Sequence, residues 1–439
     1  MNEPNRARRL NTSGAQHKTT YHSAGSSSGS TRRTVHTAAG GRTQAPKPAA
    51  GTSARGNTGK GRRKKKNGCL MPLLVTVCVL AVIVLGAWQI VMHAIRPDSD
   101  TPSLKELITS IGTPDEYSGD VMNILVCGID SDEGETRSYG DGSNDGMTDM
   151  IMYVNFDVKN KKASLLQIPR NTFVGPSVTT DNGTYSASNG QINSVMISND
   201  EGITALCDVV SYTLQLPIDH YITINMKAMK EVVDTFGGIE VYVPQDIEYA
   251  GSVLRQGYQT LDGNAAEFFV RNRHGSGFAR GDLDRLNMQR YFYSGLLGRI
   301  RTMTLKDAVK LTPAFMNYVT TDLDTGTIAK LAVSLLKTDS ANIMLCQLPE
   351  YSAGERYNNN SILVGATDAT AALLNQYFRT YTGEVPAGSL HFTSWSTVGE
   401  PSDPNVQYMG QLDTERENGQ ENENLDGSYT VTAENTAVQ

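Results

Sequence analysis

The sequence predicts an α/β domain of about 260 residues, at positions 119–382, that follows a single membrane-spanning helix. Short apolar runs alternate with amphipathic segments from Asn123 onward, which favours strands and helices packed in layers. Cys69–Ile95 contains no Asp, Glu, Lys or Arg and is longer than the roughly 20 residues that a helix needs to cross a bilayer. We therefore expect a membrane-attached chain with one large folded domain.

The expected elements follow from hydrophobic periodicity and from Gly and Pro at their ends. The predicted strands are Asn123–Ile129, Met150–Asp157, Ala163–Ile168, Tyr221–Asn225 and Ile239–Val243. The predicted helices are Gly202–Leu216 with Asp200 as its cap, Met226–Phe236 closed by Gly237-Gly238, Leu286–Thr302, Thr327–Leu336 and Asp368–Tyr381.

The transmembrane segment sets the topology. Arg62-Arg63-Lys64-Lys65-Lys66 precedes it and only Arg96 follows it, so the positive-inside rule places the N-terminus in the cytoplasm and the domain outside the cell. A cleaved signal peptide is the alternative, but the apolar run is long for one and begins far from the N-terminus. Residues 96–118 are expected to connect the helix to the domain.

Two segments have compositions typical of disorder. Residues 1–68 hold 15 Lys+Arg against one acidic residue, with few large apolar side chains, so we expect a disordered basic cytoplasmic tail. This tail suits anionic lipid head groups, and nucleic acid is the weaker alternative. Residues 383–439 are polar and acidic and are expected to form a disordered external tail. Three cysteines follow the apolar run, Cys127, Cys207 and Cys346, and their spacing matches no metal motif. Buried thiols are favoured, and one disulfide among them is the alternative.

The segment Gly263–Arg290 contains five arginines around Asp282, Asp284 and Gln289. Phe268–Arg273 resembles a strand, which would direct Arg271 and Arg273 to one face. Asp282, Arg285 and Gln289 follow helical spacing. Arginine clustered with so little lysine favours bidentate binding of phosphate, whereas the alternative is two solvated charged faces.

Two carboxylates and a further arginine occur at predicted strand ends. Asp130 follows the first strand, Asp149 begins the second, and Arg170 follows the third. Ligands of open α/β sheets bind at such edges, and two carboxylates beside a pyrophosphate suit Mg²⁺. For Asp130 alone, an ordinary turn or helix-cap aspartate is the alternative.

In this order the motifs resemble the LytR-CpsA-Psr family, also called the cell envelope-related transcriptional attenuator domain. The motifs are Asn123–Asp130, Thr148-Asp149-Met150, Ile168-Pro169-Arg170, Ile192-Asn193, Phe236–Val241, Leu261-Asp262-Gly263, Val270–Arg273, and Gly281–Arg285 with Gln289. The resemblance implies one mixed-sheet α/β/α domain outside the plasma membrane of a Gram-positive-type cell.

The resemblance also implies an enzyme that joins a glycopolymer, such as teichoic acid or capsule, from undecaprenyl pyrophosphate to peptidoglycan through a phosphodiester. By similarity, Asp130 and Asp149 would hold Mg²⁺ or Mn²⁺. Arg170, Arg271, Arg273 and Arg285 would bind the pyrophosphate, Asp282 would hold the arginines in place, and Gln289 would add a hydrogen bond. The apolar core would receive the polyprenyl chain.

Three positions depart from the family pattern. Met147 and Met288 stand where the family commonly has arginine, and Asn171 stands where it commonly has aspartate. These departures keep two other hypotheses open: a hydrolase of lipid pyrophosphate, in which water replaces the sugar acceptor, and a lipid-binding envelope regulator without turnover.

Overall fold

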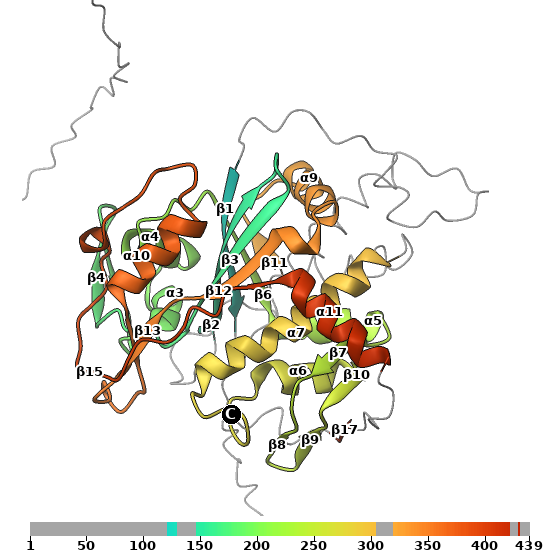
Figure 1. Cartoon of the computed structure of the whole chain (residues 1–439). Coiled ribbons are helices and arrows are strands. Elements are labelled where there is room, and N and C mark those ends of the chain that lie inside the picture. Colours follow the sequence, from blue (N-terminus) through green and yellow to red (C-terminus); the bar gives the residue numbers. More distant parts are fainter. Residues whose placement is uncertain (1–120, 130–145, 304–318, 422–428, 431–439) are drawn as a thin grey trace, which may run out of the picture. The chain divides into compact units, whose positions relative to one another are not determined.

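The computed structural model describes residues 121–129, 146–303, 319–421 and 429–430, which form a mixed seven-stranded sheet with helices on both faces (Figure 1). The strands lie in the order β11 (Val319–Thr321), β6 (His220–Asn225), β1 (Val121–Ile129), β2 (Thr148–Asp157), β3 (Lys162–Ile168), β12 (Ile343–Gln347) and β16 (Gln407–Tyr408). The pairs β1–β6 and β3–β12 are parallel and the other neighbours are antiparallel.

Alternating side chains of the central strands supply two separate cores. On β1, Ile124 and Val126 enter one core, whereas Leu125 and Cys127 enter the other, as the two-residue period of a strand requires. The first core is closed by α5 (Met226–Thr235), α6 (Gly263–Arg271), α7 (Asp282–Arg301), α9 (Thr325–Leu336) and α11 (Met409–Glu421). The second is closed by α3 (Val195–Ser198), α4 (Ile203–Leu214) and α10 (Thr367–Tyr377). The expected α/β/α arrangement is confirmed.

Smaller elements decorate this frame. They are β4 (Ser177–Thr179) with β5 (Thr184–Ser186), η1 (Ile192–Ser194), β7 (Ile239–Val243) with β10 (Gly257–Leu261), β8 (Ile247–Tyr249) with β9 (Ser252–Leu254) and β17 (Tyr429–Thr430), η2 (Ser340–Asn342), β13 (Glu350–Ala353) with β14 (Leu363–Gly365) and β15 (Thr397–Val398), and η3 (Ala387–Ser389).

Most predicted elements occur close to their predicted bounds, but α7 begins at Asp282 rather than Leu286, and α10 ends at Tyr377 rather than Tyr381. A cap also differs. The N-cap of α4 is Gly202, with a positive φ of 60°, rather than Asp200. The end of α5 is as expected, because Gly238 adopts φ 105° and its amide donates to Val233 O at 2.9 Å. A Cβ at Gly238 would lie 2.6 Å from Thr260 Cγ2, so a larger residue is excluded there.

The prediction of a strand at Phe268–Arg273 is wrong, because these residues largely belong to helix α6. Asp262 caps this helix by accepting a hydrogen bond from Ala265 N at 2.8 Å, and Arg271 pairs with Glu267 one turn earlier at 2.5 Å. Capping and this pair outweigh the strand preference of the aromatic residues. Arg271 ends the helix and Arg273 lies beyond it, so the two do not share a strand face.

The prediction of a disordered tail from residue 383 is also wrong for residues 383–421. Strand β16 joins the main sheet, and α11 packs against α7 (Figure 1). Met409 and Leu412 are the buried apolar anchors of α11. Asp413 adds hydrogen bonds from Ser294 Oγ at 2.6 Å and from Ser340 Oγ. Because polar contacts supply much of this attachment, hydrophobic periodicity did not reveal it.

Within the described part of the chain, no helix has the length and apolar character needed to span a membrane. The predicted basic tail, transmembrane helix and connector, at positions 1–118, lie outside the described residues. The expectation of buried thiols is confirmed for Cys127 and Cys346, whereas Cys207 is half-buried, and none of the three forms a disulfide.

Candidate functional site

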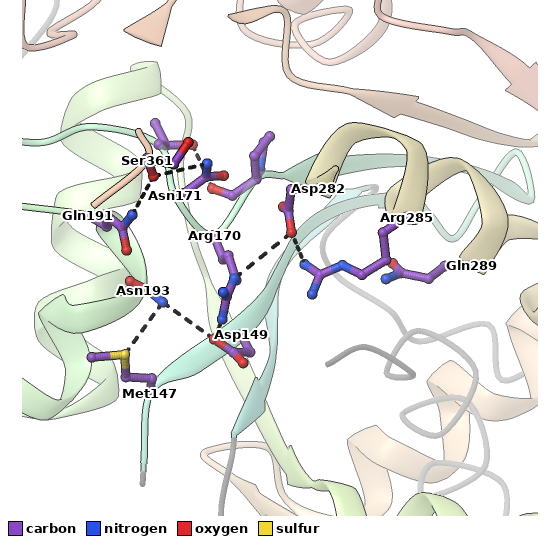
Figure 2. A network of polar contacts seen from close by, with 12 residues as sticks. Met147, Asp149, Arg170, Asn171, Gln191, Asn193, Asp282, Arg285, Gln289 and Ser361 are labelled. Atoms are coloured by element: carbon purple, nitrogen blue, oxygen red, sulfur yellow. Dashed lines mark hydrogen bonds and ion pairs between the residues drawn. The ribbon is translucent and has the colours of Figure 1, made fainter. Parts of the chain in front are cut away.

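Three neighbouring strands and helix α7 bring the candidate residues to one edge of the sheet. The end of β1 pairs with the start of β2 through Ile129 and Thr148, so Asp149 lies at this edge. Strand β3 reaches the same edge and continues into a turn closed by a hydrogen bond from Thr172 N to Pro169 O at 3.1 Å. Arg170 occupies the turn, and α7 begins opposite it (Figure 2).

The central contact joins Arg170 to Asp149. Arg170 Nη1 lies 2.6 Å from Asp149 Oδ1, with the side chains only 12% and 1% exposed. Asn193 Nδ2 approaches the same oxygen at 3.4 Å. Burial raises the pKa of Asp149 to about 7, although Arg285, the hydrogen bond from Asn193, and Arg273 each lower it.

The first turn of α7 places a second carboxylate between two arginines. Asp282 Oδ1 lies 2.5 Å from Arg285 Nη2 and 3.9 Å from Arg170 Nε (Figure 2). An acidic residue is stabilised in the first helical turn by the unpaired backbone N–H groups. Asp282 is therefore positioned to orient Arg170 and Arg285 together, which is the arrangement expected from the resemblance.

Arg271 and Arg273 complete the positive side of the site. Burial, followed by repulsion from Arg273, Arg285 and Arg271, lowers the pKa of Arg170 well below its usual value. Burial and the charge of Arg285 likewise lower the pKa of Arg273. Arg271 is buried and paired with Glu267, which also contacts Lys230 at 2.9 Å. The four arginines thus lie close enough to repel one another. We call Arg170, Arg271, Arg273 and Arg285 the arginine cluster.

Gln289 has a different place from the one expected. It is 0% exposed, its Nε2 donates to Val270 O at 3.1 Å, and its Oε1 accepts from Tyr293 Oη at 3.3 Å. Both polar atoms are thus used inside the protein. Gln289 thus links α7 to the end of α6, which carries Arg271. This link helps to fix the position of the arginine cluster.

Two of the five arginines in the Gly263–Arg290 segment do not join the cluster, although all five were expected to converge on one site. Arg280 is 53% exposed and pairs with Asp284 at 2.6 Å. Arg290 is fully buried, and its Nε donates to Gln167 Oε1 at 2.8 Å. A helix that places Arg285 at the site necessarily directs Arg290 to another face.

The three family departures have distinct surroundings. Met147 Sδ lies 3.6 Å from Asn193 Nδ2, beside Asp149 (Figure 2). Asn171 Nδ2 donates weakly to Ser361 O at 3.4 Å, in the turn that carries Arg170. Met288 is buried in the first core. Only the first two departures therefore alter the immediate surroundings of the site.

One nearby carboxyl group escaped the sequence reasoning. Glu350, at the start of β13, is buried, and burial raises its pKa well above its usual value, offset in part by a hydrogen bond from Thr172. No local sequence signal marks Glu350, because its burial depends on the docking of β13 behind the Arg170 turn.

Of the two carboxylates expected to hold a metal ion, Asp149 is among the described residues and Asp130 is not. Among the described side chains, no group of three or more His, Cys, Asp and Glu is arranged to hold a metal ion. Mg²⁺ is nevertheless commonly held by one or two carboxylates together with phosphate oxygens and water. Asp149 has the ligand chemistry for a site of that kind, in which phosphate oxygens of a ligand would supply further coordination.

Comparisons with known proteins identify the family to which the chain is similar. The model of the LytR_cpsA_psr family matches residues 98–379. The polyisoprenyl-teichoic acid–peptidoglycan teichoic acid transferase TagU of Bacillus subtilis is 26% identical over 246 residues, which are 54% of this chain and 72% of TagU. The transferase TagV of Bacillus subtilis is 27% identical over 242 residues, 52% of this chain and 56% of TagV, so the match spans little more than half of TagV.

Among solved structures, gbs0355 of Streptococcus agalactiae matches with a TM-score of 0.49 and 20% identity, over 64% of this chain and 92% of that one. The match to the family model covers well over half of the chain and includes Asp149, Arg170 and the α7 motif. This chain is therefore a member of the LytR-CpsA-Psr family.

Proposed function

We propose that this protein transfers a glycopolymer from polyprenyl pyrophosphate to peptidoglycan, forming a phosphodiester at the outer face of the plasma membrane. The observation that carries the proposal is the arginine cluster, in which Arg170 is lined by Asp149 and Asp282 yet repelled by three further arginines. The carboxylates of Asp149, Asp282 and Glu267 do not balance the four guanidinium groups, so a polyanion would stabilise the site. The names of TagU and TagV support teichoic acid as the class of polymer.

The reaction needs position and charge stabilisation more than covalent help. A sugar hydroxyl oxygen of the acceptor forms a bond to the phosphorus that carries the glycopolymer. The bond from that phosphorus to the bridging oxygen breaks, and polyprenyl phosphate leaves. The hydroxyl proton passes to a carboxylate near the site.

In this proposal, the arginine cluster holds the pyrophosphate oxygens, and Asp282 fixes the directions of Arg170 and Arg285. Mg²⁺ or Mn²⁺ held by Asp149 and Asp130 would neutralise part of the phosphate charge. Residues 69–95 anchor the chain as a single-pass helix, with its N-terminus in the cytoplasm and residues 119–421 outside. Protease digestion of intact cells, with tags at each terminus, tests that topology: the C-terminal tag is lost and the N-terminal tag is protected.

The activity is tested with the full chain in detergent and Mg²⁺, a polyprenyl-pyrophosphate-linked saccharide and a peptidoglycan oligosaccharide. Mass spectrometry should detect a phosphodiester-linked product from the wild type, and Asp149→Asn should abolish it. Arg255→Ala is the matched control, because Arg255 is an exposed arginine whose partner at 2.8 Å, Asp246, is not a residue of the candidate site. Release of a free saccharide phosphate would instead indicate a hydrolase. Lipid binding without either product would indicate the regulatory alternative.

A further inference from the structure

Three aromatic rings gather next to the turn that carries Arg170. Phe173 lies 5.0 Å from Tyr357 and 5.1 Å from Trp395, and the rings of Tyr357 and Trp395 are 5.4 Å apart, measured between centroids. Phe173 is 2% exposed and forms the base, whereas Trp395 is 36% exposed and Tyr357 is partly exposed. We call these three residues the aromatic platform.

Backbone geometry holds Tyr357 in place. Tyr357 and Asn360 exchange two backbone hydrogen bonds, of 3.1 and 2.8 Å, around a tight turn in which Asn358 and Asn359 have positive φ values of 47° and 66°. On the other side, a Cβ at Gly190 would lie 2.4 Å from Tyr357 Cε1. Gly190, with φ 76°, is therefore required for the ring to pack against this backbone.

Trp395 is fixed equally well although it is exposed. Its indole Nε1 donates to Glu355 O at 3.1 Å, and Gly354 N donates to Ser396 O at 2.8 Å. The next residues, Thr397 and Val398, pair with β13. An exposed aromatic ring that is already immobilised loses little conformational entropy when a ligand covers it.

The platform and the arginine cluster share a short stretch of chain. Phe173 follows Arg170 by three residues, so their Cα atoms are no more than about 11 Å apart. Two amide side chains meet at this stretch: Gln191 Nε2 donates to Ser361 O at 2.8 Å, and Asn171 Nδ2 approaches the same oxygen (Figure 2). A ligand that crosses from the arginine cluster to the platform passes charged, then polar, then aromatic groups.

We propose that the aromatic platform is a carbohydrate subsite, which binds a sugar ring of the saccharide adjacent to the reacting phosphate. This inference rests on the proposed function. The C–H face of a pyranose is weakly positive and suits the negative face of an aromatic ring, while its hydroxyl groups suit the neighbouring amides. A polyprenyl chain suits this place poorly, because it would gain burial on one side only and would displace water from the polar amides.

The sugar ring can belong to the peptidoglycan acceptor or to the glycopolymer, and tryptophan fluorescence separates these sources. The sequence contains two tryptophans, so Trp88→Phe in the full chain leaves Trp395 as the only one. This variant is titrated separately with a peptidoglycan disaccharide, a soluble repeat of the glycopolymer, and a short-chain polyprenyl phosphate. We expect a saturable change in Trp395 emission with one of the two saccharides and none with the lipid.

Kinetics give the second readout. We expect Trp395→Ala to raise KM for the saccharide that alters the emission about tenfold, with kcat within about twofold, and Trp395→Phe to recover most of the loss. Tyr381→Ala is the matched control: Tyr381 is 50% exposed and donates to Asp157, eight residues along β2 from Asp149 and thus about 27 Å away. This variant should leave KM unchanged.

Two results would overturn the subsite. One is an unchanged KM for both saccharides in Trp395→Ala while the wild type transfers polymer normally. The other is an emission change with polyprenyl phosphate alone. Saccharide binding at Trp395 in a wild-type protein that transfers no polymer would instead contradict the proposed function and leave the subsite standing.

Discussion

Arg285 and Arg290 lie five residues apart on α7, both almost completely buried, but in opposite electrostatic settings. Arg290 donates to three neutral acceptors: Gln167 Oε1 at 2.8 Å, Gln407 Oε1 at 2.8 Å and Asn405 O. Arg285 has an ion pair with Asp282 and is close enough to Arg170 and Arg273 to lower the pKa of each. Asp282 Oδ1 contacts Arg285 Nη2, whereas Arg285 Nε has no hydrogen-bond partner among the described residues.

In the proposed function, this difference separates a structural arginine from a ligand-binding one. Burial lowers the pKa of Arg290 to about 10, and neutral dipoles solvate most of its charge, although its Nη2 has no hydrogen-bond partner among the described residues. The fold itself thus supplies most contacts of Arg290, whereas the arginine cluster would offer donors and charge to a ligand. Groups arranged for binding commonly reduce stability in this way.

The largest expected effect concerns the cluster. Arg273→Gln should lower turnover about 100-fold, because one donor to the developing charge is lost. It should leave the melting temperature unchanged or slightly higher, because Arg170 and Arg285 are then repelled less. Transfer assays and thermal unfolding, with Arg255→Gln as the control, measure both quantities. If turnover of Arg273→Gln stayed within threefold of the wild type, the contrast between the arginine cluster and Arg290 would fail.

The next effect concerns Arg290. Arg290→Met should lower the free energy of unfolding by roughly 3 kcal/mol, because the acceptor on buried Gln167 and those on half-buried Asn405 and Gln407 lose their donor. Denaturant titration measures the loss. Turnover of the folded variant at low temperature should stay within about threefold. A stable variant with little activity would place Arg290 in the site after all.

The smallest effect concerns the environment of Arg290. Gln167 Oε1 accepts from Arg290, and Gln167 Nε2 donates to Leu286 O at 3.0 Å. Gln167→Glu keeps the acceptor but loses that donor, so we expect a loss of about 1–2 kcal/mol in denaturant titration. Gln167→Met, which removes both groups, should lose more. If Gln167→Glu were more stable than the wild type, a charged partner would suit Arg290 better than the neutral amide.

Many of the helices and strands could be predicted from local sequence patterns. The strand at Ile239–Val243 has the predicted bounds, and the closure of α5 by Gly237-Gly238 is confirmed. These features depend on side-chain alternation and on backbone conformations that glycine adopts readily. Gln289 was predicted at the correct helical position, but its partners, Val270 O and Tyr293, depend on how α6 meets α7.

Phe268–Arg273 and residues 383–421 show where local patterns fail. The aromatic residues before Arg271 favour a strand, yet the Asp262 cap and packing in the first core make them helical. The segment after residue 383 has too few apolar residues for a core of its own, and it is ordered by Arg290, Ser294 and Ser340 of the main domain. The local sequence around Trp395 therefore gave no indication that this residue belongs to the aromatic platform.

The sequence by itself determined the α/β class, the family, and the residue types that meet a polyanion, because these depend on periodicity and on motifs in a fixed order. Only the tertiary structure decided which arginines meet. Arg170, Arg271, Arg273 and Arg285 converge because β3, α6 and α7 end or begin at one edge of the sheet. Arg290 is diverted to neutral partners by the helical period, and Phe173, Tyr357 and Trp395 meet through contacts between distant segments. Such contacts are set by packing, which no local stretch of the chain encodes.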